Sequence, residues 1–232
     1  MKKTYAIITA RKNSKAIKKK NLLKIGKDTL ISRSIKILKN AKIFQKIFLS
    51  SDSNQFLNIA ERMNIIPIKR PKKYSTDTAT SEKAVIHFIN FLKQKKIILP
   101  KYIFIIQPTS PFVNENTLKK ALNLIQKGKA ASVISLIKTP HKYHYENQRI
   151  IKKNNVVKFI FKKKSNLRQK KIITFVHGNI FAVRTDEFIK QKRILAEPIY
   201  SLKLKNNWEA LDIDNSEDIR LARVILDNLK KM

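Results

Sequence analysis

The 232-residue chain contains no cysteine, which excludes disulfide bonds, thiol nucleophiles and zinc sites built on thiolates. It also lacks long hydrophobic runs, because no stretch approaches the roughly 20 apolar residues that a membrane-spanning helix needs. The apolar segment 5–10 is too short for the hydrophobic part of a signal peptide, and Arg11 ends it at once. We therefore expect a cytoplasmic protein without membrane insertion.

Acidic residues and glycine are scarce as well. Asp and Glu number 16 against 51 Lys and Arg, which gives a formal net charge of +35, and there are three glycines. Such a charge predicts attraction to polyanions. However, 41 of the basic residues are Lys, spread along the whole chain, whereas dedicated nucleic-acid binders favour clustered Arg. We interpret the charge as base-composition drift. We expect weak, salt-sensitive polyanion binding and no specific nucleic-acid partner.

Short apolar runs alternate with helical periods along the chain, and 43% of its residues are hydrophobic. Continuous apolar runs are typical of strands buried on both faces of a parallel sheet. We predict strands at 5–10, 47–50, 65–68, 102–106, 131–136 and 178–183. We predict helices at 30–38, 56–63, 81–95, 117–126 and 216–229, with Ser216 as the N-cap of the last. This alternation indicates an α/β fold with a mostly parallel sheet and helices on both faces.

Two later segments read differently. Lys-rich stretches interrupt the pattern at about 139–174, and we interpret them as an inserted, hairpin-like flap within a single domain that spans 1–232. Residues 211–214 are predicted to be short and extended. In open α/β sheets the ligand binds beyond the carboxyl ends of the strands. We therefore expect the site among the loops that follow the strands, at 11–21, 51–53, 70–81 and 107–112.

The first of these loops is rich in Lys and follows a predicted strand. Fixed cations at such a place neutralise a triphosphate and stabilise the charge of a pyrophosphate leaving group. The glycines of a Walker A loop are absent. In so basic a chain, a solvated Lys-rich loop is an interpretation that this segment alone does not exclude.

Two aspartates near the carboxyl terminus, Asp212 and Asp214, flank Ile213. Alternate residues of an extended segment face the same side, so both carboxylates are expected to point one way. Two hard oxygen ligands suit Mg²⁺, which completes its shell with water and substrate phosphates. The alternative is an ordinary charged segment before a helix. The scarcity of acids in this chain favours the metal site.

Five short motifs lie in order between residues 6 and 222. They read Arg11-x-x-Ser14-Lys15-x-Ile17-x-x-Lys20-Asn21, Ser50-Ser51-Asp52, Arg70-Pro71 with Thr76-Asp77-Thr78-Ala79-Thr80-Ser81, Gln107-Pro108-Thr109-Ser110-Pro111, and Asp212-Ile213-Asp214 with Asp218. Their order and spacing resemble those of the acylneuraminate cytidylyltransferases, the CMP-sialic acid synthetase family. Each motif alone is unspecific, and the resemblance rests on all five together.

The resemblance implies a Rossmann-like nucleotidyltransferase fold and an enzyme that transfers CMP from CTP to the anomeric hydroxyl of a nonulosonic acid, a nine-carbon 2-keto sugar acid. It implies Mg²⁺ as cofactor, held by Asp212 and Asp214, and a homodimer formed through the flap. The implied nucleotide-binding residues are Arg11, Ser14, Lys15, Lys20, Asn21, Arg70 and Ser81, with Asp52 near the cytidine. Of these, Arg11, Lys15 and Lys20 are the implied catalytic cations. The implied sugar-binding residues are Gln107, Arg168, Gln169 and His177. For Ser81, helix capping is as good an interpretation as ligand contact.

The chain departs from this family pattern mainly on the sugar side. Phe112-Val113 stands where the family has Leu-Arg, and His177-Gly178 where it has Asn-Gly. The first loop has Lys12-Asn13 and Ala16 where the family is rich in glycine. The sequence therefore leaves open whether the sugar is of the neuraminate, legionaminate or pseudaminate type. A second hypothesis is an α/β scaffold that has lost catalysis and binds polyanions.

Overall fold

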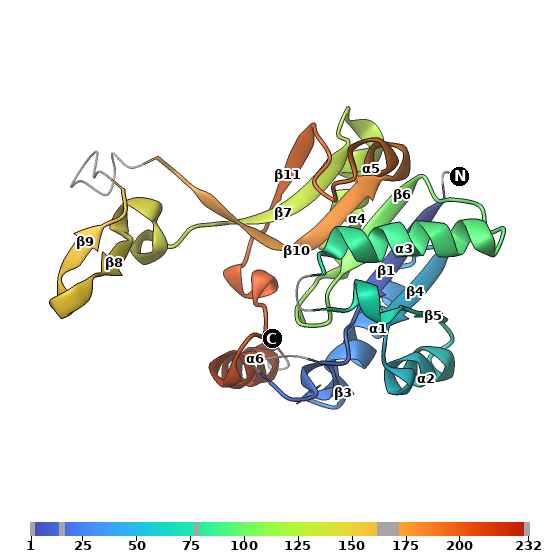
Figure 1. The fold of residues 1–232 in the computed structure, drawn as a ribbon, viewed down its shortest axis with the longest axis horizontal. Helices are drawn as coiled ribbons and strands as arrows, with labels where there is room; N and C mark the ends of the chain where they lie inside the picture. The colour runs from blue at the N-terminus through green and yellow to red at the C-terminus, as the bar shows by residue number, and fades with distance from the viewer. Residues whose placement is uncertain (1–2, 14–16, 77–78, 162–171, 230–232) are drawn as a thin grey trace.

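The computed structural model describes residues 3–13, 17–76, 79–161 and 172–229. A seven-stranded sheet in the order β11-β7-β10-β6-β1-β4-β5 forms its centre (Figure 1). The strands are β1 (Thr4–Thr9), β4 (Lys46–Ser51), β5 (Ile66–Lys69), β6 (Tyr102–Ile106), β7 (Ser132–Lys138), β10 (Phe175–Arg184) and β11 (Ile199–Lys203). Within this sheet β10 alone is antiparallel to its neighbours. The predicted mostly parallel α/β fold is confirmed.

Helices cover both faces of the sheet, as predicted. One face carries α1 (Leu30–Ala41), α2 (Asn54–Arg62) and α4 (Glu115–Lys127), whose apolar sides share one buried core with the sheet. The other face carries α3 (Ser81–Gln94) and α5 (Thr185–Gln191), which share a second core. Each helix buries the side chains that recur at helical spacing, which is why the sequence pattern located four of these five.

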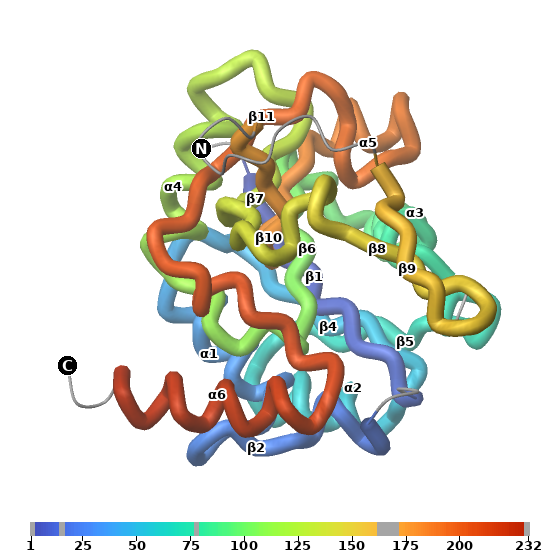
Figure 2. The backbone as a smooth tube through the Cα atoms, turned by 90° about the vertical axis from the view of Figure 1, so that its left-hand side faces the viewer, coloured from blue at the N-terminus to red at the C-terminus, as the bar shows by residue number. Residues whose placement is uncertain are grey.

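The last helix, α6 (Ser216–Leu229), packs outside these two layers. It lies beside the small hairpin of β2 (Lys24–Ile25) and β3 (Asp28–Thr29), as Figures 1 and 2 both show. A third apolar cluster fills this contact and contains Ile25, Leu30, Phe112, Ile213 and Ala222. The cluster places residues 211–214 next to the loop that follows β6. Among the described residues, no helix is both long and apolar enough to cross a membrane.

Several local predictions are wrong. The helix α6 begins at Ser216, which is therefore not its N-cap as predicted. The side-chain oxygen of Asn215 caps this helix instead, by accepting the backbone N–H groups of Glu217 at 2.8 Å and Asp218 at 3.1 Å. The pattern also missed α5 and β11. The helix α5 is only seven residues long, and β11 is a largely exposed edge strand. Short or exposed elements give little hydrophobic pattern to recognise.

Residues 139–174 connect β7 to β10, and Figure 1 shows the described part of this segment lying away from the sheet. It contains an antiparallel pair, β8 (Arg149–Ile151) and β9 (Val157–Phe159). At its base, the backbone N–H of Thr139 donates to the carbonyl of Thr174 at 2.9 Å. We call this segment the flap. Many apolar side chains in the described part of the flap are exposed, and this part has no core of its own comparable with that of the sheet.

Candidate active site

A cavity of about 310 Å³ opens at the carboxyl ends of β1, β5 and β6. Three of the four loops that the sequence analysis singled out contribute to it, together with the segment before α6. It brings together these predicted site residues: Arg11, Lys20, Asn21, Arg70, Ser81, Gln107, Asp212 and Asp214. The location of the site follows from the parallel strands, whose carboxyl ends meet at one edge of the sheet.

Other predicted residues lie elsewhere. His177 is on β10, exposed, with its ring 6.4 Å from the ring of Phe181, and it does not line the cavity. Asp52 does not line the cavity either. The predictions for Ser14, Lys15, Arg168 and Gln169 fall outside the described residues.

Two side chains hold the first loop in place, one from the end of β4 and one from within the loop itself. The carboxylate of Asp52 accepts the backbone N–H of Lys12 at 2.7 Å, and the buried amide of Asn21 donates to the carbonyl of Arg11 at 3.0 Å. The backbone N–H of Ala10 also donates to Ser50 at 3.1 Å. Asp52 and Asn21 therefore hold Arg11 at the cavity wall, a role that the motif pattern did not distinguish from ligand contact.

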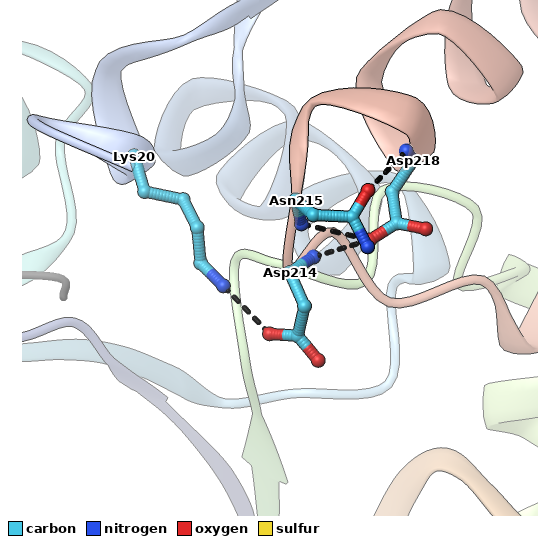
Figure 3. Close-up of polar contacts among 4 residues, drawn as sticks. All are labelled: Lys20, Asp214, Asn215 and Asp218. Atoms are coloured by element: carbon cyan, nitrogen blue, oxygen red, sulfur yellow. Dashed lines mark hydrogen bonds and ion pairs between the residues drawn. The ribbon is translucent and has the colours of Figure 1, made fainter. Parts of the chain in front are cut away.

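Lys20 connects the first loop to the acid pair. It begins a short 3₁₀ turn (Lys20–Leu22) and follows Lys19, whose backbone is left-handed with φ of 55°. Its side chain is only 11% exposed, and its Nζ lies 2.9 Å from Oδ1 of Asp214 (Figure 3). The carboxylate of Asp214 is 73% exposed, so water screens this ion pair and limits its contribution to stability. A cation thus already sits against one of the two predicted magnesium ligands.

Arg70 is a buried cation at the end of β5. Its backbone N–H donates to the carbonyl of Ser51 at 2.7 Å, its residue is 6% exposed, and its Nε has no hydrogen-bond partner among the described residues. Burial lowers the pKa of its guanidinium, Asp52 opposes this shift, and nearby Arg11 adds to it. An arginine stays charged under such a shift. Two guanidiniums near one carboxylate leave an excess of positive charge that suits an anionic ligand.

His87 on α3 lies behind this wall, with its ring 5.3 Å from the ring of Tyr74, which lines the cavity. Burial lowers the pKa of His87, and the charges of Arg70 and Lys73 lower it further. Burial and these two neighbouring charges therefore favour the neutral imidazole.

The acid pair owes its orientation to the residue between its members. Ile213 is fully buried in the third apolar cluster, and its backbone N–H donates to the carbonyl of Thr109 at 2.8 Å. Because Ile213 points into this cluster, Asp212 and Asp214 on either side both line the cavity. Both acids of the predicted pair therefore lie at one cavity, next to one anchored residue and not on a strand.

Asp218, the last acid of the fifth motif, is turned toward the backbone. Its Oδ2 accepts the N–H groups of Asp214 at 2.8 Å and Asn215 at 2.9 Å, as Figure 3 shows. Together with the cap formed by Asn215, this is a reciprocal capping box at the start of α6. Asp218 therefore fixes the backbone that carries Asp214.

The loop after β6 is held from outside the motifs. Arg33 on α1 donates from Nε to the carbonyl of Pro111 at 2.6 Å, and its guanidinium lies 5.4 Å from the ring centre of Phe112. Phe112 is buried and packs edge-on against Trp208 at 5.9 Å. Phe112, one of the positions at which this chain departs from the family pattern, therefore anchors the loop after β6 by apolar packing. No sequence signal pointed to Arg33, because it is remote in sequence from the loop it holds.

The family model for cytidylyltransferases matches residues 5–232. This chain belongs to the cytidylyltransferase family.

Named relatives agree with this assignment at modest identity. The chain is 26% identical over 225 residues to the pseudaminic acid cytidylyltransferase of Campylobacter jejuni, covering 96% of both proteins. It is 28% identical to the N-acylneuraminate cytidylyltransferase of Escherichia coli, covering 96% of this chain and 52% of that protein. It is 25% identical to a Helicobacter pylori protein named pseudaminic acid cytidylyltransferase and UDP-2,4-diacetamido-2,4,6-trideoxy-beta-L-altropyranose hydrolase, of which it spans 44%.

Solved structures share the fold of this cytidylyltransferase. A CMP:2-keto-3-deoxy-manno-octonic acid synthetase complexed with CTP superposes with a TM-score of 0.71 at 11% identity, covering 98% of this chain and 99% of that one. The 4-diphosphocytidyl-2C-methyl-D-erythritol synthase of Anaerococcus prevotii gives a TM-score of 0.63 at 16% identity, covering 97% of this chain and 96% of that one. At such identities the likeness establishes the fold alone.

The acid pair of the cytidylyltransferase fits a Mg²⁺ site whose ligands come partly from the protein and partly from water and substrate. Within the described parts of the chain, no group of three or more His, Asp or Glu side chains is placed to hold a metal. Asp212 and Asp214 supply two carboxylates of the hard-oxygen type that Mg²⁺ prefers, and water and substrate phosphates ordinarily supply the rest. The ammonium of Lys20 beside Asp214 shows that this side of the cavity accepts a cation.

The capping box generates a stability prediction. Asp218→Ala removes the acceptor of two backbone N–H groups, and we expect it to lower the free energy of unfolding by roughly 1–3 kcal/mol. Glu217→Ala, at the neighbouring exposed position, is the matched control and is expected to change it by less than about 0.5 kcal/mol. Urea denaturation of both variants measures the difference. Equal stabilities would contradict the structural role given to Asp218.

Proposed function

We propose that this cytidylyltransferase transfers CMP from CTP to the anomeric hydroxyl of a nonulosonic acid and releases pyrophosphate. The observation that supports this most is the cavity in which Arg11, Lys20 and Arg70 face the acid pair. The Campylobacter and Escherichia relatives, named for pseudaminic acid and N-acylneuraminate, support the choice of sugar acid. The proposal concerns the transferase reaction alone, because the chain spans only about half of two of its relatives.

In the proposed reaction the anomeric oxygen attacks the α-phosphorus of CTP. The new P–O bond forms as the bond to the β-phosphate oxygen breaks, the hydroxyl proton passes to solvent, and pyrophosphate leaves with the bonding electrons. When bound at Asp212 and Asp214, Mg²⁺ lowers the pKa of the attacking hydroxyl and steadies the α-phosphate. No side-chain nucleophile is needed.

The cations of the cavity have separate tasks in this proposal. Arg11 and Lys20, on the first loop, neutralise the triphosphate and the charge that develops on the leaving pyrophosphate. Arg70, buried with an unpaired Nε, donates to an oxygen of the nucleotide. Ser81 begins α3, whose amino-terminal end lines the cavity and carries the positive end of the helix dipole. Gln107, in the loop after β6, donates hydrogen bonds to the sugar acid and accepts hydrogen bonds from it.

The acid pair is tested by pyrophosphate release from CTP and Mg²⁺ with neuraminate, legionaminate and pseudaminate-type acids. We expect release with at least one sugar, and Asp212→Asn should lower kcat at least about a hundredfold, because metal stabilisation of the transition state is worth several kcal/mol. Asp186→Asn is the control, since Asp186 pairs with Arg184 at 2.6 Å outside the cavity.

Failure of this assay would favour the second hypothesis, the polyanion-binding scaffold. Its signature is the absence of pyrophosphate release with every sugar acid of the panel, together with tight RNA binding that weakens steeply as the salt concentration rises. Retention of full activity in Asp212→Asn would instead reject the metal role of the pair while keeping the enzyme.

Replacing Lys20 should have opposite effects on the affinities for CTP and for Mn²⁺. Lys20→Met should weaken CTP binding at least tenfold, because a fixed cation at the triphosphate is lost. The same change should strengthen Mn²⁺ binding to the nucleotide-free protein, because Asp214 loses the ammonium that competes with the metal. Lys12→Met removes the same charge from an exposed position and is the control. Calorimetry with CTP and, separately, Mn²⁺ measures both, and parallel weakening of both ligands would contradict the competition.

We further propose that the flap joins two copies of the chain. Exposed apolar side chains cluster on its described part: Ile150, Ile151, Val156, Val157, Phe159, Ile160, Phe161, Ile172 and Ile173. Patches of this kind on soluble proteins mark interaction surfaces. A second copy, with its own flap, offers a self-complementary surface of the kind found in two-fold dimers.

The dimer is tested with Ile151→Asp/Val157→Asp, which places two charges on side chains that are 76% and 56% exposed. We expect the wild type to sediment as a dimer and the double variant as a folded monomer. Ile98→Asp, at an apolar residue that is 65% exposed outside the flap, is the control and should remain dimeric. A monomeric wild type, or a dimeric double variant, would refute the role of the flap.

A further inference from the structure

A buried carboxylate lies just before the acid pair. Glu209 belongs to the 3₁₀ turn η7 (Asn207–Ala210) and is 6% exposed. No Lys or Arg of the described residues forms an ion pair with it. In a chain with 51 basic and 16 acidic residues, an acid in this position is unexpected. Burying such a group is unfavourable unless hydrogen bonds compensate, so its partners indicate what it does.

Those partners come from separate elements. Oε2 of Glu209 accepts the hydroxyl of Thr117 on α4 at 3.1 Å, and Oε1 accepts the amide of Asn206 at 3.3 Å. The main-chain carbonyl of Glu209 accepts the side-chain amide of Asn179 on β10. One residue of a short turn is therefore tied to a helix of one face and to a strand of the sheet.

Asn179 reaches the turn because β10 is irregular there. The pairing of β10 with β7 shifts register between His177 and Phe181, and the N–H of Ile180 turns to the hydroxyl of Ser135 at 3.0 Å. At Gly178 the strands approach so closely that a Cβ would lie 2.5 Å from that hydroxyl oxygen. The bulge thus directs the buried side chain of Asn179 toward η7.

The turn leads directly into the acid pair. The N–H of Leu211 closes it by donating to Trp208 at 3.1 Å, and Trp208 packs against Phe112 on the loop after β6. Only Ala210 and Leu211 separate Glu209 from Asp212. On the far side, Ile213 is fixed by its hydrogen bond to Thr109. Glu209 and Ile213 therefore hold the backbone of Asp212 from both sides.

We propose that Glu209 is a positioning residue that sets the metal-binding geometry of Asp212 and Asp214. Its carboxylate acts through Thr117 and Asn206, its main-chain carbonyl holds Asn179, and it touches neither nucleotide nor metal. This inference rests on the proposed function, in which the pair holds Mg²⁺. Removal of a residue that orients metal ligands without binding the metal ordinarily lowers metal affinity by about 10–100-fold.

The test measures Mn²⁺ binding by paramagnetic resonance on the full chain with CTP and without sugar acid, so no turnover is involved. Glu209→Ala should weaken Mn²⁺ binding roughly tenfold or more. It should leave metal-free CTP binding within about twofold, because Arg11, Lys20 and Arg70 are not contacted by Glu209. Glu209→Gln, which keeps one acceptor oxygen, should be intermediate. Thr117→Val keeps the shape, removes one donor, and should also weaken Mn²⁺ binding.

Glu146→Ala is the matched control, because Glu146 is an equally buried acid in the flap, 2% exposed, away from the cavity. A general loss of stability would lower the melting temperature of Glu146→Ala and Glu209→Ala alike. Only the Glu209 and Thr117 variants should lose Mn²⁺ affinity. Unchanged Mn²⁺ binding in folded Glu209→Gln and Thr117→Val would overturn the inference. Unchanged Mn²⁺ binding in Asp212→Asn would instead reject the metal role of the pair, the part of the proposed function on which this inference rests.

Discussion

The attachment of Ile213 is the constraint on which the site depends. Burial of this side chain, together with its hydrogen bond to Thr109, joins a segment near the carboxyl terminus to the loop after β6. Without it, the two aspartates would belong to a loose connection before α6. With this attachment, the two aspartates line the same cavity as cations from the first third of the chain. The cavity is therefore a product of tertiary packing between distant segments and not of any one motif.

Electrostatics explain what such a cavity is able to bind. Cations from two loops surround it, Arg70 among them with an unsatisfied donor, while the acids lie on one side. A nucleoside triphosphate with a divalent cation complements both signs at once, because its phosphates meet the cations and its metal meets the acids.

Much of the fold could be predicted because buried parallel strands are continuously apolar, and because each of their helices buries one stripe. The edge of the sheet that carries the site followed from the same pattern. What the sequence could not predict are contacts between remote residues. The hold of Arg33 on Pro111, the capping of α6 by Asn215 and the buried position of Glu209 all depend on tertiary neighbours. The sequence also did not indicate that His177 lies outside the cavity, because a motif gives order along the chain but not the direction of a side chain next to a bulge.

The central claim is that one cavity binds nucleotide and metal together, and a crystal structure with CTP and Mn²⁺ tests it most directly. The anomalous signal of Mn²⁺ locates the metal independently of the nucleotide. The account predicts one strong Mn²⁺ peak in contact with Asp212 and Asp214, with the triphosphate against Arg11 and Lys20. A metal peak away from the two aspartates, or a nucleotide bound outside this cavity, would contradict it.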